Sequence, residues 1–328
     1  MKNKPIIIIS GEPYSIFLEI FFKIYKSNFF FKYKIPIVLI ASKKIVEMQM
    51  KAMNFSFKIN QISSKEVFNK YLTNSKINLI DVHLNYKKPF GKISSKSSKY
   101  INDCFNIGLK LMKDKKGLGI INGPISKRHF LKNKFPGVTE YLSNKINKSK
   151  KEVMLIYNKK LSVSPITTHI PLKHVNRHIS INKIVNKITT IDTFYKKKLN
   201  KKPSFGIAGL NPHCESNYND SEEEKIIKPA IRMLKKKHIK IEGPLPADTL
   251  FIKKNRIKFD VIVGMYHDQV LTPLKTLFGF NAINLTLGLP FVRVSPDHGP
   301  NNQMLGQKKS DISSFKESLI FLKKLNGN

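Results

Sequence analysis

Short apolar runs alternate with longer segments of helical periodicity along the chain. Each run is continuously apolar instead of alternating with polar residues, which is typical of strands that are covered on both faces. The segments predicted as strands are Ile6–Ile9, Ile37–Ala41, Asn78–Val82, Leu118–Ile121, Val153–Tyr157, Phe205–Ala208, Val261–Val263 and Ile283–Thr286.

Helical periodicity fills the intervals between these strands. Apolar residues at helical spacing predict a helix over Tyr100–Met112 and another over Ile181–Ile191, which Ser180 would cap. The Phe- and Ile-rich stretch Ile16–Phe31 predicts a first helix packed against a sheet. Strands and helices that alternate in this way indicate an α/β protein with layered helices.

Two further signals mark element boundaries in the second half. Ser221 and Glu224 form a capping box and predict the start of a helix, which Pro229 is expected to kink. The polar stretch 144–151 predicts a surface loop. No internal repeat or long linker interrupts the α/β pattern.

The composition and charge of the chain indicate which kinds of partner it can bind. The 328 residues suffice for two α/β domains or one large one, and the formal net charge of +37 first suggests a nucleic acid or an anionic membrane. The positive residues are nearly all Lys, with only five Arg, and they are spread from end to end instead of forming a stripe that could follow a nucleic-acid groove. We therefore expect no specific nucleic-acid partner, and a positive field that attracts an anionic substrate.

The cysteines and the N-terminal segment indicate the compartment. Cys104 and Cys214 form neither a metal-binding pair nor a disulfide framework, so a reducing cytoplasm is expected. The apolar run Ile6–Ile9 is too short for a signal sequence. A membrane span over Ile16–Phe31 is disfavoured because charged residues interrupt it: Glu19, Lys23 and Lys26.

Three short polar motifs in the second half each place one His just after a strand, in a turn. They are Thr167-Thr168-His169-Ile170-Pro171, Gly209-Leu210-Asn211-Pro212-His213 and Met265-Tyr266-His267-Asp268-Gln269. Ligand sites in open α/β sheets lie at the carboxyl ends of strands, so three converging imidazoles would make a metal site that leaves the full divalent charge available to a substrate. A single His at a strand end is more often a structural residue, and spacing alone leaves both interpretations open.

A second group of polar residues follows the third motif. Lys275, Asn284 and Arg293 could together bind phosphate and carboxylate, and Arg293 stands out because Arg is scarce in this chain. The alternative is that Lys275 is one of many surface lysines and that Arg293 is a salt-bridged loop residue.

The order of these motifs resembles one family. Thr167–Leu172, Gly209–His213 with Glu223-Glu224, Gly243–Phe251 and Met265–His298 follow one another as in 4-hydroxythreonine-4-phosphate dehydrogenases of pyridoxal phosphate biosynthesis. The combination of Tyr266-His267-Asp268-Gln269 with Thr286-Leu287-Gly288-Leu289-Pro290 is the most specific part, and the resemblance covers most of the chain.

The resemblance implies roles for individual residues. His169, His213 and His267 would bind a divalent metal (zinc, magnesium or cobalt), with ligands drawn from both subunits of a homodimer. The phosphorylated substrate would be bound by Thr139, Lys275, Asn284 and Arg293. Asp248 and Asp268 would be acidic residues at the site and, like Lys275, candidates for catalysis. Lys275 would transfer a proton or bind the phosphate or carboxylate.

The resemblance also implies a fold and a reaction. The family has a two-domain α/β/α arrangement like that of isopropylmalate dehydrogenase, with the active-site cleft between domains at a dimer interface. We expect residues 1–130 with 296–328 to form the cofactor domain, and residues 131–295 to carry the metal and substrate residues and the interface. The reaction would be oxidation of a secondary alcohol by NAD or NADP, followed by decarboxylation.

Several positions depart from the family pattern. Val138 replaces a His, which removes a polar substrate contact and costs about 1–3 kcal/mol if a buried partner stays unpaired. The turn Gly11–Phe17 loses the small residues of the family, and Asn122–Lys127 differs from its Thr-x-Pro-x-x-Lys segment. The loop 300–306 lacks the Asp that would meet a cofactor ribose, and no cofactor-binding residue is assigned.

Three hypotheses follow from this combination. The chain is the enzyme of the pyridoxal pathway, or a paralogue that oxidises another phosphorylated hydroxy acid such as threonate or erythronate 4-phosphate, or a non-catalytic relative that binds metal and anions. The three histidines, Lys275 and Arg293 favour the first two, and Val138 favours altered specificity.

Overall fold

The chain divides into two compact units. Unit 1 contains residues 1–141 and 289–327, and unit 2 contains residues 142–288. The boundaries fall after Tyr141 and Gly288, whereas the sequence placed them after residues 130 and 295. The structure is a computed structural model that describes residues 4–27, 29–69, 72–132, 134–135, 137–146, 152–214 and 220–326.

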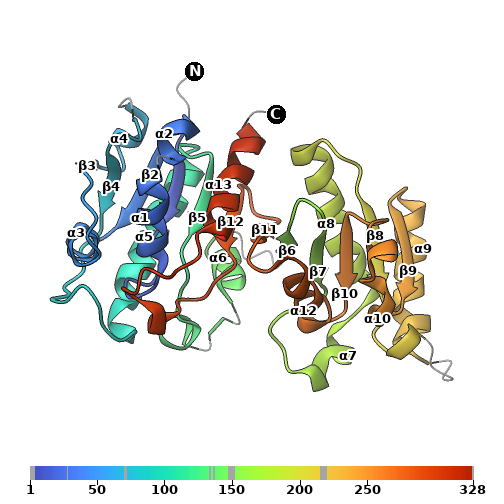
Figure 1. Cartoon of the computed structure of the whole chain (residues 1–328). Helices are drawn as coiled ribbons and strands as arrows, with labels where there is room; N and C mark the ends of the chain where they lie inside the picture. Colours follow the sequence, from blue (N-terminus) through green and yellow to red (C-terminus); the bar gives the residue numbers. More distant parts are fainter. Residues whose placement is uncertain are drawn as a thin grey trace. The chain divides into compact units, whose positions relative to one another are not determined.

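Unit 1 is built around a parallel sheet with the strand order β3-β4-β2-β1-β5-β12 (Figure 1). Its central strands are completely buried because helices cover both faces of the sheet. The strands are β1 (Ile6–Ile9), β2 (Ile37–Ala41), β3 (Ile59–Gln61), β4 (Ile77–Asp81), β5 (Gly119–Asn122) and β12 (Arg293–Pro296).

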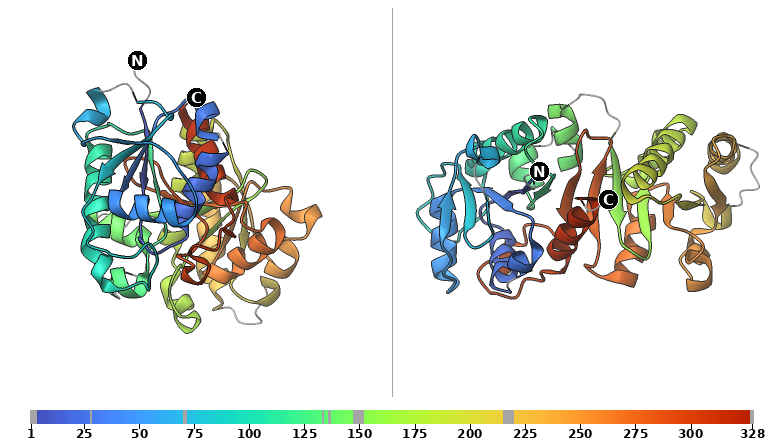
Figure 2. Two further views of the ribbon diagram at one scale, coloured as in Figure 1. Left: turned by 60° about the vertical axis from the view of Figure 1, so that its left-hand side comes forward. Right: turned by 90° about the horizontal axis from the view of Figure 1, so that it is seen from above.

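The helices of unit 1 form two layers. Figure 2 shows α5 (Ser98–Lys113) on one face of the sheet, and α1 (Phe17–Lys26) and α13 (Ser313–Asn326) on the other. The remaining helical elements are α2 (Phe29–Tyr33), α3 (Lys43–Ala52), α4 (Glu66–Asn69), η1 (Ser95–Ser97), η2 (Lys127–Leu131), η6 (Asn302–Met304) and α6 (Val138–Ile146), which crosses into unit 2.

The segment 289–327 is anchored to the N-terminal part of unit 1. Strand β12 pairs with β5, Arg293 opposite Ile120. The buried carboxylate of Glu19 in α1 accepts hydrogen bonds from the backbone N–H of Ser310 (2.9 Å) and from its hydroxyl (2.6 Å). Unit 1 is therefore complete only when the segment after residue 288 is in place.

Unit 2 contains a mixed sheet with the order β11-β6-β7-β10-β8-β9. The strands β7, β10, β8 and β9 run parallel, whereas β6 is antiparallel to both of its neighbours. The strands are β6 (Val153–Tyr157), β7 (Ser162–Pro165), β8 (Ser204–Ala208), β9 (Lys240–Leu245), β10 (Val261–Gly264) and β11 (Ile283–Leu287).

Helices cover both faces of this sheet as well. Figure 2 shows α8 (Ile181–Leu199) and α9 (Lys228–Lys236) on one face, and α12 (His267–Phe278) and α10 (Ala247–Leu250) on the other. The shorter elements are η3 (Leu172–His174), α7 (Val175–His178), η4 (Pro212–Cys214), η5 (Glu223–Ile227) and α11 (Lys253–Arg256). None of the helices in the described residues is both long enough and apolar enough to cross a membrane.

The structure confirms the mixed α/β class and most predicted elements. Ser180 caps α8 by accepting a hydrogen bond from the N–H of Lys183. Pro229 lies in the first turn of α9, directly after the π-helical turn η5, so the helical run changes from π to α geometry next to this proline.

Other boundaries differ from the sequence prediction. The first predicted helix ends at Lys26, and a second one begins at Phe29. The expected loop 144–151 begins inside α6, which extends to Ile146, and residues 147–151 lie outside the described residues.

Four strands were missed by the sequence pattern: β3, β7, β9 and β12. Strands β3 and β9 lie at the outer ends of the two strand orders and are only partly buried, so they lack a continuous apolar run. Strand β7 contains Ser162 and Ser164, and β12 begins with Arg293. These polar residues are buried and therefore break the apolar signal that defined the other strands.

Candidate functional site

The three motif histidines follow three adjacent parallel strands of unit 2. Strand β10 lies between β7 and β8 and is parallel to both. His169 follows β7, His267 follows β10, and His213 follows β8, so all three loops leave the same edge of the sheet. This edge is the carboxyl end of the strands, where α/β proteins bind their ligands.

Hydrogen bonds join the loops that carry His169 and His267. The backbone N–H of Ile166 donates to the carbonyl of Gly264 (2.8 Å). The hydroxyl of Thr167 donates to the carbonyl of Met265 (2.7 Å). Both bonds extend the β7–β10 pairing beyond the strands, so the two loops are held side by side.

Gln269 joins the His267 loop to the loop that carries His213. Its Nε2 donates to the carbonyl of Gly209 (2.7 Å), and its Oε1 accepts from the backbone N–H of Met265 (2.7 Å). One side chain in the first turn of α12 therefore satisfies backbone groups that follow both β8 and β10. Sequence reasoning assigned no role to Gln269, although the residue belongs to the third motif.

His169 and His267 lie next to each other. Their ring centroids are 5.7 Å apart, with an angle of 41° between the ring planes. His267 is the first residue of α12, not a turn residue as expected, because the helix begins directly after Tyr266. The Nδ1 atom of His267 lies 2.6 Å from Oδ1 of Asp268, which leaves its Nε2 for another partner.

His213 occupies an exposed turn with a left-handed backbone (φ 57°). The carboxylate of the buried Glu223 supports this turn by accepting hydrogen bonds from the backbone N–H groups of Leu210 (2.7 Å) and Asn211 (2.9 Å). Burial alone would raise the pKa of Glu223, but these hydrogen bonds and the one from the Asn211 side chain lower it. The turn is therefore held by an ionised carboxylate.

Within one chain, the described residues bring together two of the three histidines. No group of three His, Cys, Asp or Glu side chains in the part of the chain that the structure describes is close enough to hold a metal ion. His169 and His267 form a pair, and His213 is not grouped with them. A metal site with three histidine ligands would therefore need a third ligand in addition to this pair.

The predicted anion-binding residues fall in both units. Thr139 and Arg293 belong to unit 1, although the sequence placed them in the second domain, whereas Lys275 and Asn284 belong to unit 2. Lys275 is exposed on α12, and its Nζ lies 5.8 Å from the centroid of the Phe280 ring. The Oδ1 atom of Asn284 is buried with no hydrogen-bond partner among the described residues.

The other predicted residues differ in exposure. Thr139 is buried in α6, one residue after the half-buried Val138. Asp248 is exposed in α10. Asp268 is largely exposed but contacts His267, so its position connects it to the His pair.

Arg293 is buried in unit 1, with 1% of its surface exposed. Its Nε donates a hydrogen bond to Oδ1 of Asn122 (2.7 Å). Burial lowers the pKa of Arg293 to about 10, and the carboxylate of Glu140 acts in the opposite direction. The guanidinium therefore keeps its positive charge at neutral pH. Sequence reasoning missed this contact with Asn122, although it marked the segment 122–127 as a departure from the pattern that the chain resembles.

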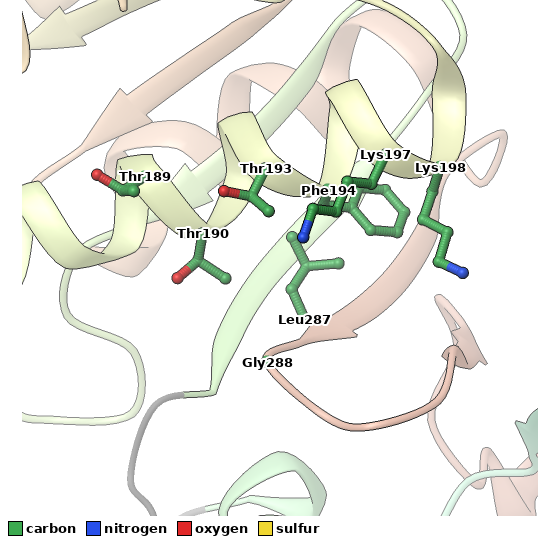
Figure 3. Close-up of a pocket in the computed structure, with 8 residues that line it drawn as sticks. All are labelled: Thr189, Thr190, Thr193, Phe194, Lys197, Lys198, Leu287 and Gly288. Atoms are coloured by element: carbon green, nitrogen blue, oxygen red, sulfur yellow. The ribbon is translucent and has the colours of Figure 1, made fainter. Parts of the chain in front are cut away.

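A separate hollow of about 310 Å³ lies beside α8 and the end of β11 (Figure 3). Figure 3 shows Lys197 and Lys198 extending from α8 above Leu287. None of the predicted site residues is among the described residues that line it: Thr189, Thr190, Thr193, Phe194, Lys197, Lys198, Leu287 and Gly288. The candidate chemistry therefore lies at the His-bearing edge and not in this hollow.

Comparison with known proteins identifies relatives over nearly the whole chain. A family model described as pyridoxal phosphate biosynthetic protein PdxA matches residues 32–321. The chain is 39% identical to a 4-hydroxythreonine-4-phosphate dehydrogenase of Sulfurihydrogenibium, over 97% of this chain and 98% of that protein. It is 32% identical to a putative D-threonate 4-phosphate dehydrogenase of Oceanobacillus iheyensis, over 97% of both chains.

A solved structure shares the fold. The chain superposes on a putative 4-hydroxythreonine-4-phosphate dehydrogenase from Salmonella typhimurium with a TM-score of 0.84 and 29% sequence identity. The match covers 98% of this chain and 99% of that one.

Proposed function

Because this chain belongs to the PdxA family of pyridoxal phosphate biosynthetic proteins, we propose that it oxidises 4-phosphohydroxy-L-threonine as a 4-hydroxythreonine-4-phosphate dehydrogenase. The observation that carries the proposal is the pairing of His169 with His267 at the carboxyl edge of the unit 2 sheet, in a chain that matches such enzymes from end to end. A phosphorylated hydroxy acid is also the class of substrate that a strongly positive protein attracts.

The residues at the edge of unit 2 fit a divalent metal. A ring separation of 5.7 Å allows His169 and His267 to direct one nitrogen each to a common ion. The contact of His267 with Asp268 is the arrangement that orients a metal-binding imidazole. We assign the third position to His213 of a second copy, because one chain does not group the three rings. Imidazole ligands favour zinc or cobalt over magnesium.

The metal and the nicotinamide cofactor would supply one part of the chemistry, and the protein side chains supply the other. When bound, the divalent metal would lower the pKa of the substrate's secondary alcohol and stabilise negative oxygen, and NAD or NADP would accept the electron pair. The protein side chains bind and orient the substrate: Arg293, Thr139 and Asn284 supply positive charge and hydrogen bonds. Lys275 is assigned to proton transfer, Asp268 orients His267, and Asp248 supplies a further carboxylate at the site.

The proposal also includes a homodimer and a domain that binds the nicotinamide cofactor. A homodimer whose active-site cleft lies at the interface, in an isopropylmalate-dehydrogenase-like arrangement, would bring the third histidine to the pair. We assign the cofactor to unit 1, which contains residues 1–130 and 296–327 of the expected cofactor domain. The reaction is placed in the cytoplasm, in keeping with two cysteines that form no disulfide among the described residues.

A second candidate function is oxidation of another phosphorylated hydroxy acid, such as threonate or erythronate 4-phosphate. Val138 in place of the family His favours it, and so does the match to a putative D-threonate 4-phosphate dehydrogenase. A non-catalytic relative that binds metal and anions is the third candidate, and the departures in the loop 300–306 favour it.

One assay separates these candidates. The purified protein is incubated with NAD or NADP and, in turn, with 4-phosphohydroxythreonine, threonate 4-phosphate and erythronate 4-phosphate, with and without a chelator, while nicotinamide absorbance is recorded. We expect chelator-sensitive reduction of the nicotinamide, fastest with 4-phosphohydroxythreonine. Preference for a threonate or erythronate phosphate would establish the paralogue, and metal binding without turnover of any substrate would establish the non-catalytic relative.

A further inference from the structure

Arg293 is an unusual residue for the interior of unit 1. It is among the largest completely buried side chains of the chain, and it lies at the first position of β12. A buried guanidinium needs hydrogen-bond partners, because its desolvation costs several kcal/mol by order of magnitude when the charge is left unpaired. The hydrogen-bond partners of Arg293 therefore determine the orientation of its guanidinium.

Asn122 holds the guanidinium at its Nε. The residue ends β5, the strand that pairs with β12, and it is completely buried. Its Oδ1 accepts from Arg293 Nε (2.7 Å), and its Nδ2 donates to the carbonyl of Gly123 (2.8 Å). Because both ends of the amide are hydrogen-bonded, its orientation is fixed, and its oxygen is a fixed acceptor for the Nε–H of Arg293.

The partner at Nε is neutral, and the carboxylate of Glu140 also acts on the guanidinium. An amide oxygen orients Arg293 without cancelling its charge, whereas a carboxylate at the same distance would form an ion pair.

We propose that Asn122 is a positioning residue that orients Arg293 for the phosphate or carboxylate of the substrate without adding a negative charge beside its Nε. This inference rests on the proposed function, in which Arg293 binds the anionic substrate. Asn122 itself contacts no substrate and acts through the guanidinium.

Two substitutions test the two parts of the proposal. Asn122→Ala removes the contact with Nε, and Asn122→Asp keeps an acceptor there but adds a negative charge. We expect both to raise KM for 4-phosphohydroxythreonine by about tenfold or more, with kcat changed by less than about threefold, because a hydrogen bond or charge that directs an anion-binding arginine acts on binding. In an Arg293→Lys background, which lacks the Nε contact, the effect of Asn122→Ala on KM should disappear.

Asn78 provides the matched control. It is a buried asparagine of β4 in the same sheet, and its Nδ2 donates to the carbonyls of Ile37 (3.0 Å) and Thr73 (2.9 Å). Asn78→Ala should lower Tm and leave KM unchanged, because its hydrogen bonds serve only the fold. If the Asn122 variants behave like this control, lowering Tm at constant KM, the positioning role is wrong.

Binding of inorganic phosphate, followed by calorimetry, separates this inference from the proposed function. A wild-type protein that binds phosphate but oxidises none of the phosphorylated hydroxy acids would overturn the proposed function. In that case the inference still requires Asn122→Asp to weaken phosphate binding by about tenfold. Turnover that is insensitive to both Asn122 variants would overturn the inference alone, and a wild-type protein with neither activity nor phosphate binding would overturn both.

Discussion

Gln269 in the first turn of α12 donates a hydrogen bond from its Nε2 to the backbone carbonyl of Gly209, 2.7 Å away. The same side chain accepts from the N–H of Met265. Two loops that each carry a candidate metal ligand are therefore connected by one amide, to which the sequence assigned no role.

Replacement of this amide should loosen both loops. We expect Gln269→Met to reduce metal content at limiting metal and to lower kcat/KM by about tenfold or more, because two backbone groups lose their partner at about 1–3 kcal/mol each. Metal analysis and steady-state kinetics measure the two effects. Gln307→Met, at an exposed glutamine of unit 1, is the control and should change neither. Full metal content and activity in Gln269→Met would show that the link is dispensable.

Asp268 should act on the metal through His267. We expect Asp268→Ala to weaken metal affinity by about 10- to 100-fold, which is the usual effect of removing a carboxylate that orients a metal-binding imidazole. Competition with a chromophoric chelator measures this affinity. Asp103→Ala, at a carboxylate of α5 that pairs with Lys99, should leave the affinity unchanged. Loss of kcat at unchanged metal affinity would instead assign Asp268 a direct part in the chemistry.

Val138 should determine substrate preference. For the enzyme of the pyridoxal pathway, we expect Val138→His to leave kcat/KM for 4-phosphohydroxythreonine unchanged or to raise it by about 2- to 10-fold, the contribution of one hydrogen bond. The measurement is kcat/KM for this substrate and for threonate 4-phosphate. A switch of preference from threonate 4-phosphate to 4-phosphohydroxythreonine would identify the wild type as the paralogue.

Glu12 should make the stability of the protein depend on pH. It is 2% exposed, and burial raises its pKa from 4.5 to about 7, although a hydrogen bond from Ser97 lowers it. Because the pKa in the folded state is the higher one, the contribution of this group to stability is complete below about pH 4.5 and is lost as the pH rises to about 7, by about 3 kcal/mol at most.

Glu12→Gln removes this titration. We expect its free energy of unfolding to fall less than that of the wild type between about pH 5 and about pH 8, when both are measured by urea denaturation. Glu47→Gln, at an exposed carboxylate of α3, should follow the wild type. Parallel pH profiles for Glu12→Gln and the wild type would show that Glu12 is not the titrating group.

The buried strands could be predicted from sequence because their environment is uniform. Ile6–Ile9 and Val153–Tyr157 were predicted with the bounds that the structure has, since nearly every side chain in them is covered. Strand β7 was missed because Ser162 and Ser164 are buried through tertiary hydrogen bonds. The Ser162 hydroxyl bonds to Tyr195, and the Ser164 hydroxyl donates to the carbonyl of Met154. Such partners are distant in sequence and leave no local pattern.

The candidate site, like the strands, could be predicted from the sequence only in part. The motifs placed His169 and His267 after strands but left open whether they converge, and the structure places their rings side by side. The motifs also did not show that His267 begins α12, because Tyr266 makes no side-chain cap. The contact of Arg293 with Asn122 joins residues 171 positions apart, and only the pairing of β12 with β5 brings them together. Supporting residues of this kind require the fold.

The division of unit 1 into two chain segments has a consequence for biosynthesis. Residues 289–327 leave the ribosome after all of unit 2, so β5 has an open edge while residues 142–288 are being made. An open strand edge is a template for pairing with other chains until β12 occupies it. A truncation or a translational pause before Arg293 would therefore leave unit 1, the half that is begun first, with an unpaired strand.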